Sequence, residues 1–151
     1  MIEACRIAAL QADRIDELQA IEQAAYSHPW SAPIMLDSFR AKTPCTGLLD
    51  EAGKILAYAF VLTAVGEAQI LNITVAPERQ GQGLGRRLME YLLDRARDDG
   101  CTVVLLEVRR SNKPARLLYE RLGFATVGVR KGYYPSAEGR EDALVLAFEI
   151  L

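Results

Sequence analysis

Residues 79–100 read RQGQGLGRRLMEYLLDRARDDG and indicate the fold class of the whole chain. Apolar residues recur every four positions from Leu84 to Ala96, which predicts an amphipathic helix that ends at Gly100. The stretch before it, residues 68–76 (AQILNITVA), is apolar and β-forming, and it predicts a strand. A strand, a glycine-rich turn and a helix are therefore expected in direct succession.

The segments on either side of this unit continue the alternation of strands and helices. The predicted elements are a strand at 3–9, a helix at 13–26 with Asp13 as a cap, a helix capped by Ser31, a hairpin over 48–61, a strand at 101–108, a helix at 114–122 and strands at 124–130 and 143–150. The order is mixed α/β. Because no repeat or linker interrupts it, residues 1–151 are expected to form a single domain.

Composition excludes several classes of function. A formal net charge of -2 over 151 residues argues against a protein that grips nucleic acid by its phosphates. One histidine and three widely spaced cysteines offer no metal-ligand cluster, so no metal site is expected. No apolar run is long enough for a membrane span and no signal peptide opens the chain, which predicts a cytoplasmic protein.

The glycines at 81, 83 and 85 allow several backbone N–H groups to converge on an anion, and the following helix adds its positive N-terminal end. Three glycines also suit a tight turn that binds nothing. The pattern is neither a Walker nor a Rossmann motif. It resembles the Q/R-x-x-G-x-G/A signature of the GNAT acetyltransferases. This resemblance implies a mixed, mostly antiparallel sheet of about seven strands flanked by four helices. It also implies that acetyl-CoA is bound by Ile73, Thr74, Val75, Gln80, Gly81, Gln82, Gly83, Leu84, Gly85 and Arg86.

Acetyl transfer to an amine needs a base for the amine and an acid for the departing thiolate. On residue patterns alone, Glu107 is a salt-bridged residue at a strand end and Tyr119 a core tyrosine, or they are the base and acid. Residues 107–112 (EVRRSN) and 115–124 (ARLLYERLGF) resemble the E-V-R-x-S-N and A-x-x-L-Y-x-x-L-G-F blocks of RimI-type GNAT enzymes. The resemblance implies Glu107 as base, Tyr119 as acid and Asn112 as a coenzyme A contact. Lys113-Pro114 departs from the small residues usual there, although proline is tolerated in a first helical turn.

Two aromatic segments also resemble RimI-type sequences: residues 28–30 (HPW) and 131–135 (KGYYP). Trp30, Tyr133 and Tyr134 can line a groove for an extended peptide, or they can belong to the core and to a hairpin loop. The resemblance implies a protein N-terminus as acceptor, namely the N-terminal alanine of the eighteenth small-subunit ribosomal protein.

Three other functions fit the same residues. The acceptor can instead be a lysine side chain or a small amine, and the chain can be a noncatalytic acyl-CoA-binding module. A ribosome-associated binding module would need a basic patch, and the local one, around Arg109 and Arg110, is short. The sequence leaves the oligomeric state open.

Overall fold

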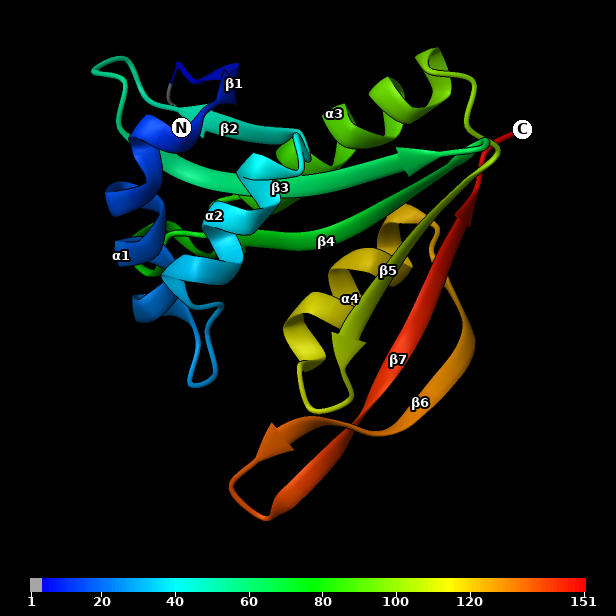
Figure 1. The fold of residues 1–151 in the computed structure, drawn as a ribbon. Helices are drawn as coiled ribbons and strands as arrows, with labels where there is room; N and C mark the ends of the chain where they lie inside the picture. Colours follow the sequence, from blue (N-terminus) through cyan, green and yellow to red (C-terminus); the bar gives the residue numbers. More distant parts are fainter. Residues whose placement is uncertain (1–3) are drawn as a thin grey trace. The chain divides into compact units, whose positions relative to one another are not determined.

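A computed structural model describes residues 4–151 (Figure 1). The elements in chain order are β1 (Arg6–Leu10), η1 (Ala12–Arg14), α1 (Ile15–Ala25), α2 (Ala32–Arg40), β2 (Cys45–Leu49), β3 (Ile55–Ala64), β4 (Glu67–Val75), η2 (Pro77–Arg79), α3 (Leu84–Asp98), β5 (Val103–Arg109), α4 (Lys113–Leu122), β6 (Ala125–Ser136) and β7 (Gly139–Glu149). The seven strands form a sheet in the order β1-β2-β3-β4-β5-β7-β6. Apart from the parallel pair β4–β5, the strand pairs for which a register is known are antiparallel, so the predicted fold class is confirmed.

The chain folds as two compact units. The first runs to Leu62 and resumes over Asn72–Leu92, and the second comprises Thr63–Leu71 and Leu93–Leu151. The cofactor turn predicted from the sequence belongs to the first unit, and the predicted base and acid belong to the second.

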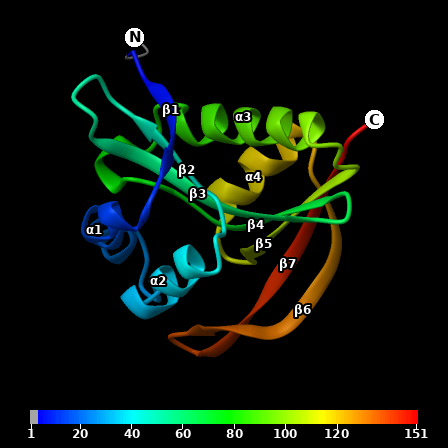
Figure 2. The same cartoon turned by 45° about the horizontal axis from the view of Figure 1, so that its top comes forward.

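In the first unit, α1 and α2 lie side by side and pack on β1, β2 and β3 (Figures 1 and 2). Leu18 from α1 and Met35 from α2 are fully buried in this core together with Tyr58 and Phe60 from β3. Burying side chains of this size contributes about 1.5–3 kcal/mol each. This core therefore holds in place the two helices that the loop between α1 and α2 joins.

Two helix starts in the first unit test the expected caps. Ser31 caps α2 as predicted, because its hydroxyl accepts a hydrogen bond from the Ile34 N–H at 3.3 Å. The expected cap at Asp13 is wrong. Asp13 lies inside η1, α1 begins two residues later, and Arg14 there forms an ion pair with Glu17 at 2.8 Å.

In the second unit, β5, β7 and β6 form an antiparallel sheet in which β7 pairs with both neighbours. The β6–β7 hairpin is longer than predicted, because residues 131–136 continue β6 and residues 139–142 begin β7, where mainly loop was expected. The register shifts between Arg130 and Tyr134, where Gly132 takes a positive φ of 58°. The hairpin segment predicted to contact substrate is therefore a bulged β-ribbon.

The ladder between β4 and β5 is short. It joins residues 67–70 to residues 103–106, whereas β4 runs on to Val75. Ile73, Thr74 and Val75 thus lie beyond the last pair of this ladder. A strand segment in that position can pair with another extended partner. The Ile73 and Val75 carbonyls already accept hydrogen bonds from the Tyr26 hydroxyl and the Gln80 amide, which such a partner would displace or share.

Candidate active site

The glycine turn before α3 has the conformation that an anion site requires. Gly81 and Gly83 have φ values of 78° and 81°, in the left-handed region that favours glycine. A Cβ placed on either residue would meet nothing within 4 Å, so their backbone faces open space. The N–H groups of the first turn of α3 have no partner within the helix. The residues present therefore fit a pyrophosphate group.

Side chains of the same turn form hydrogen bonds that stabilise it. The Gln80 Nε2 donates to the Val75 carbonyl at 3.2 Å, and the Arg79 Nε donates to Gln82 Oε1 at 3.0 Å. Leu84, only 5% exposed, is a core residue rather than a surface contact. Among the predicted cofactor residues of this segment, the side chains of Gln80, Gln82 and Leu84 support the turn and the backbone faces outward.

The last residues of the turn belong to α3 itself. Gly85 is helical, and Arg86 forms an ion pair with Glu90 at 3.6 Å one helical turn later. Both members of this pair are more than half exposed, so it is worth about 0–1 kcal/mol at most. A ligand phosphate can therefore compete for Arg86 at little cost.

A chain of hydrogen bonds links the end of β4 to the end of α1. Thr74 is 2% exposed, and its Oγ1 lies 2.9 Å from the Tyr26 hydroxyl and donates to Asn72 Oδ1 at 2.7 Å. The Tyr26 hydroxyl also donates to the Ile73 carbonyl at 3.1 Å. Burial, reinforced by the negative charge of Glu22, raises the pKa of Tyr26, so its hydroxyl is neutral at cellular pH.

Glu22 lies at the centre of this polar group, and sequence reasoning missed it. The available signal was its position: residues 15, 18, 22 and 25 form the apolar face of α1, and a glutamate interrupts it. The structure shows that this glutamate is 2% exposed and hydrogen-bonded to Tyr58, Asn72 and the Trp30 backbone. Trp30 itself is half-buried, with its ring centroid 5.3 Å from that of Phe60.

In the second unit, Glu107 lies near the end of β5 on the less buried face of that strand. Its neighbours Leu106 and Val108 are buried, whereas the Glu107 side chain is 17% exposed. Its Oε1 lies 3.4 Å from the Arg130 Nε, and the Arg130 guanidinium lies 5.1 Å from the centre of the Tyr133 ring. The salt bridge considered in the sequence reading is present, and it orients the carboxylate toward the β6–β7 hairpin.

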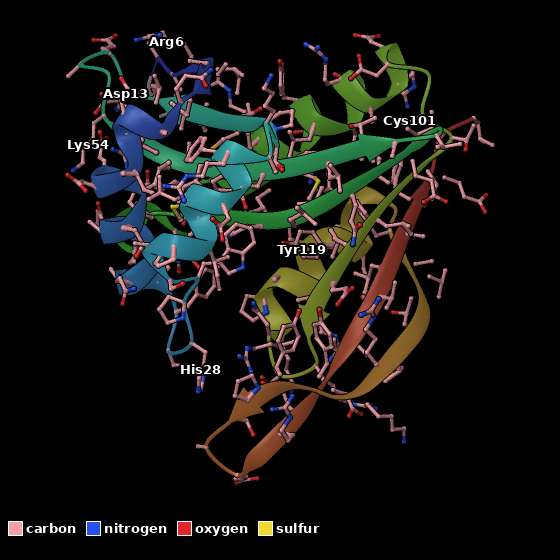
Figure 3. All side chains as sticks on the ribbon, in the orientation of Figure 1. Arg6, Asp13, His28, Lys54, Cys101 and Tyr119 are labelled. Atoms are coloured by element: carbon pink, nitrogen blue, oxygen red, sulfur yellow. The ribbon has the colours of Figure 1, made fainter. Side chains whose placement is uncertain are left out.

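Tyr119 and Asn112 belong to α4 and its start. Tyr119, which is labelled on α4 in Figure 3, is 7% exposed. Its ring packs on Phe124 with 5.8 Å between ring centroids. The Asn112 Oδ1 accepts from the Ala115 N–H at 3.3 Å and so caps the helix, with Pro114 in the first turn. The Lys113-Pro114 departure thus leaves the helix start intact, and part of the Asn112 amide is already used as a cap.

The two predicted substrate tyrosines stand on β6 with arginines against them. Tyr133 is 44% exposed, and Tyr134 is half-buried with the Arg109 guanidinium 4.5 Å from its ring centre. Burial, and secondarily the charge of Glu107, raises the pKa of Tyr134 to about 12. Arg109 also donates to Glu141 at 2.9 Å, which with hydrogen bonds from Ser111 lowers the pKa of the Glu141 carboxyl. These contacts hold the hairpin to β5.

Residues 15–124 match the model of the Acetyltransferase (GNAT) family. The chain belongs to this family. It is 38% identical over 144 residues to the [ribosomal protein bS18]-alanine N-acetyltransferase of Escherichia coli K12, covering 95% of this chain and 97% of that protein. The corresponding enzyme of Haemophilus influenzae is 37% identical over 142 residues, covering 93% and 96%.

A solved structure agrees with these relatives. The crystal structure of the ribosomal-protein-S18-alanine N-acetyltransferase from Escherichia coli superimposes with a TM-score of 0.91 at 37% identity, covering 97% of this chain and 94% of that one. As a GNAT family member, the chain is an acetyl-CoA-dependent N-acetyltransferase. Over residues 4–151, no helix is long and apolar enough to cross a membrane. The same residues contain no cluster of three or more His, Cys, Asp or Glu side chains placed to hold a metal ion.

Proposed function

We propose that this GNAT enzyme acetylates a protein N-terminus, and that its acceptor is the N-terminal alanine of ribosomal protein bS18. The observation that carries the proposal is the likeness to the Escherichia coli bS18-alanine N-acetyltransferase, which extends over 95% of the chain. The proposal includes a cytoplasmic location, since ribosomal proteins are made there. It also treats the two compact units as one acetyltransferase domain, because the family match includes parts of both.

In this proposal the backbone of Gly81 and Gly83 and the N-terminus of α3 hold the pyrophosphate of acetyl-CoA. Ile73, Thr74 and Val75 pair with its pantetheine arm, and Arg86 and Asn112 add further contacts to coenzyme A. Support comes from the positive φ of both glycines and from the position of the β4 segment beyond the β4–β5 ladder. Acetyl-CoA supplies the activated acetyl group and a thiolate leaving group.

Glu107 is the proposed general base. An α-ammonium has no lone pair, so a carboxylate must remove one proton before the nitrogen can attack. Glu107 is partly shielded from water, and Arg130 orients it. The proton leaves the acceptor nitrogen and passes to a Glu107 oxygen, directly or through one water molecule.

Tyr119 is the proposed general acid. Its hydroxyl donates a proton to the departing sulfur of coenzyme A as the C–S bond breaks. The second proton that the attacking nitrogen loses restores the Tyr119 hydroxyl, and Glu107 releases the first proton to solvent. Tyr119 is 7% exposed, and its ring is fixed against Phe124. Both features favour a fixed orientation of the hydroxyl. On the acceptor side, Trp30, Tyr133 and Tyr134 are the proposed peptide contacts.

Release of coenzyme A from acetyl-CoA tests this function. The purified protein is incubated with acetyl-CoA and with peptides that begin with the bS18 N-terminal sequence, the same peptides with a blocked α-amine, lysine peptides and small amines. The proposal predicts release with the free bS18 N-terminus and a large loss on blocking it. Release only with lysine or a small amine would identify a different acceptor, and no release with any acceptor would favour a noncatalytic acyl-CoA-binding module.

A further inference from the structure

Glu22 is a buried carboxylate that belongs neither to the cofactor turn nor to the proposed acid and base. Its Oε1 accepts from the Tyr58 hydroxyl at 2.5 Å and from the Asn72 Nδ2 at 3.0 Å. Its Oε2 accepts from the Trp30 backbone N–H at 2.8 Å. One side chain on α1 thus joins β3, β4 and the loop that leads into α2.

Placing a carboxylate at such a site is expensive. Burying an ionised group costs free energy of desolvation, which hydrogen bonds must offset. Here neutral donors form hydrogen bonds to both carboxylate oxygens. An amide does not substitute for it. A glutamine at position 22 would present an NH₂ group either to the Trp30 N–H or to the donors from Tyr58 and Asn72, so at least one donor would lose its acceptor.

One arm of the network fixes the backbone at Trp30. Glu22 accepts from the Trp30 N–H, and one helical turn earlier Gln19 donates to the Trp30 carbonyl at 3.0 Å. Both polar groups of this residue are therefore held by α1. The neighbouring His28 is exposed and projects from the same loop (Figure 3). This arm determines where the predicted acceptor-binding loop lies.

The other arm reaches the end of β4. The Asn72 Nδ2 donates to Glu22, its Oδ1 accepts from Thr74, and the Thr74 hydroxyl meets the Tyr26 hydroxyl. The Tyr26 hydroxyl in turn donates a hydrogen bond to the Ile73 carbonyl. The β4 segment proposed to pair with the pantetheine arm is thus held by a chain of hydrogen-bonded side chains that begins at the Glu22 carboxylate.

We propose that Glu22 is a positioning residue for acetyl transfer: through Trp30 it places the acceptor-binding loop, and through Asn72 and Thr74 it places the cofactor-binding segment of β4. This rests on the proposed function for the identity of the two ligands. Glu22 itself lies too deep to contact either of them. Its effect is therefore on the binding of both substrates rather than on proton transfer.

The test uses the single tryptophan of the chain, Trp30, as a reporter of the loop. Glu22→Gln is compared with wild type and with Glu51→Gln, the same chemical change in the exposed β2–β3 turn. Acrylamide quenching of Trp30 fluorescence is measured with the KM for peptide, the KM for acetyl-CoA and kcat. All are measured at a temperature where circular dichroism shows each protein folded.

Glu22→Gln is expected to increase the quenching constant and to raise both KM values about tenfold, because the loop and the β4 segment would no longer be held in the binding geometry. The kcat value should stay within about threefold, and Glu51→Gln should match wild type. Unchanged quenching with both KM values within about twofold would overturn the proposal and leave Glu22 as a fold-stabilising residue. A loss confined to kcat would also overturn it.

Two further variants separate the arms and replace Glu22→Gln if that protein does not fold. Gln19→Ala removes the donor to the Trp30 carbonyl and keeps the bond from the Trp30 N–H to Glu22, so it weakens the Trp30 arm and should raise the peptide KM alone. Asn72→Ala cuts the β4 arm and should raise the acetyl-CoA KM. Equal effects of both variants on both KM values would contradict two separate arms. If wild type transfers no acetyl group, the proposed function fails, and the quenching comparison still decides whether Glu22 positions the loop.

Discussion

Replacing Tyr58 by phenylalanine removes the hydroxyl that Tyr58 contributes to the buried network around Glu22. Tyr58 is fully buried, and its hydroxyl donates to the Glu22 carboxylate at 2.5 Å. Phenylalanine keeps the ring and its packing against Phe60, and Glu22 retains its bonds to Asn72 and Trp30. The main lost interaction is the hydrogen bond to the charged Glu22, which is worth about 1.5–3 kcal/mol, and the interaction of the same hydroxyl with Thr74 is lost with it.

For a chain of 151 residues, a destabilisation of this size corresponds to a fall in Tm of about 3–12 °C. Urea unfolding followed by circular dichroism at neutral pH measures the free energy of unfolding of both proteins. A loss below about 0.5 kcal/mol, at an unchanged dependence on urea, would refute the reasoning, because such a value belongs to an exposed side chain without a partner.

The Tyr58→Phe variant should also differ from wild type in how its stability depends on pH. Burial, and then the negative charge of Glu22, raises the pKa of Tyr58 well above its ordinary value. A phenol whose folded pKa exceeds its unfolded value of about 10 contributes stability that is fully present below that pH and is lost as the pH rises above it. Wild type should therefore lose up to about 1.4 kcal/mol per pH unit more than Tyr58→Phe above pH 10 or so. Parallel stability curves between about pH 9 and pH 11 would contradict the raised pKa.

Three more substitutions test the site and the fold. Glu107→Gln should lower kcat/KM by about 10²–10⁴-fold while calorimetric binding of acetyl-CoA is unchanged, and a full rate would exclude it as the base. Gly83→Val should raise the acetyl-CoA KM and leave the peptide KM unchanged, because φ is 81° there and the side chain would enter the space proposed for the pyrophosphate. Gly123→Ala should cost about 1–3 kcal/mol in urea unfolding, since φ is 112° and its Cβ would lie 3.0 Å from the Phe148 ring. Gly128→Ala, whose Cβ would meet Val145 at an ordinary 3.8 Å, is the matched control.

The fold could be predicted from the sequence because its strongest signals are local. The four-residue repeat from Leu84 onward, the cap at Ser31 and the stop at Gly100 each act within a few residues of the chain. The ends of the β6–β7 hairpin were harder to predict. They depend on pairing between distant residues and on a bulge near Gly132, which lets a glycine-containing polar segment continue as strand.

The site residues that carry a motif could also be predicted, because the cofactor turn is contiguous in sequence. Glu22 could not be assigned a partner in the same way. Its three donors lie 8, 36 and 50 residues away, and only the fold brings Trp30, Tyr58 and Asn72 to one carboxylate. A glutamate on an apolar helix face indicates a buried polar group, and the identity of its partners comes from the tertiary structure.

The site of acetylation on a single peptide tests the central claim most directly. A peptide with the bS18 N-terminal sequence, a free N-terminal alanine and an internal lysine is incubated with acetyl-CoA and the enzyme, and tandem mass spectrometry locates the acetyl group. The proposed function predicts acetylation of the alanine α-nitrogen, with the lysine unmodified and the reaction strongly slowed in Glu107→Gln. Acetylation of the lysine in preference to the α-nitrogen, or an unmodified peptide, would contradict it.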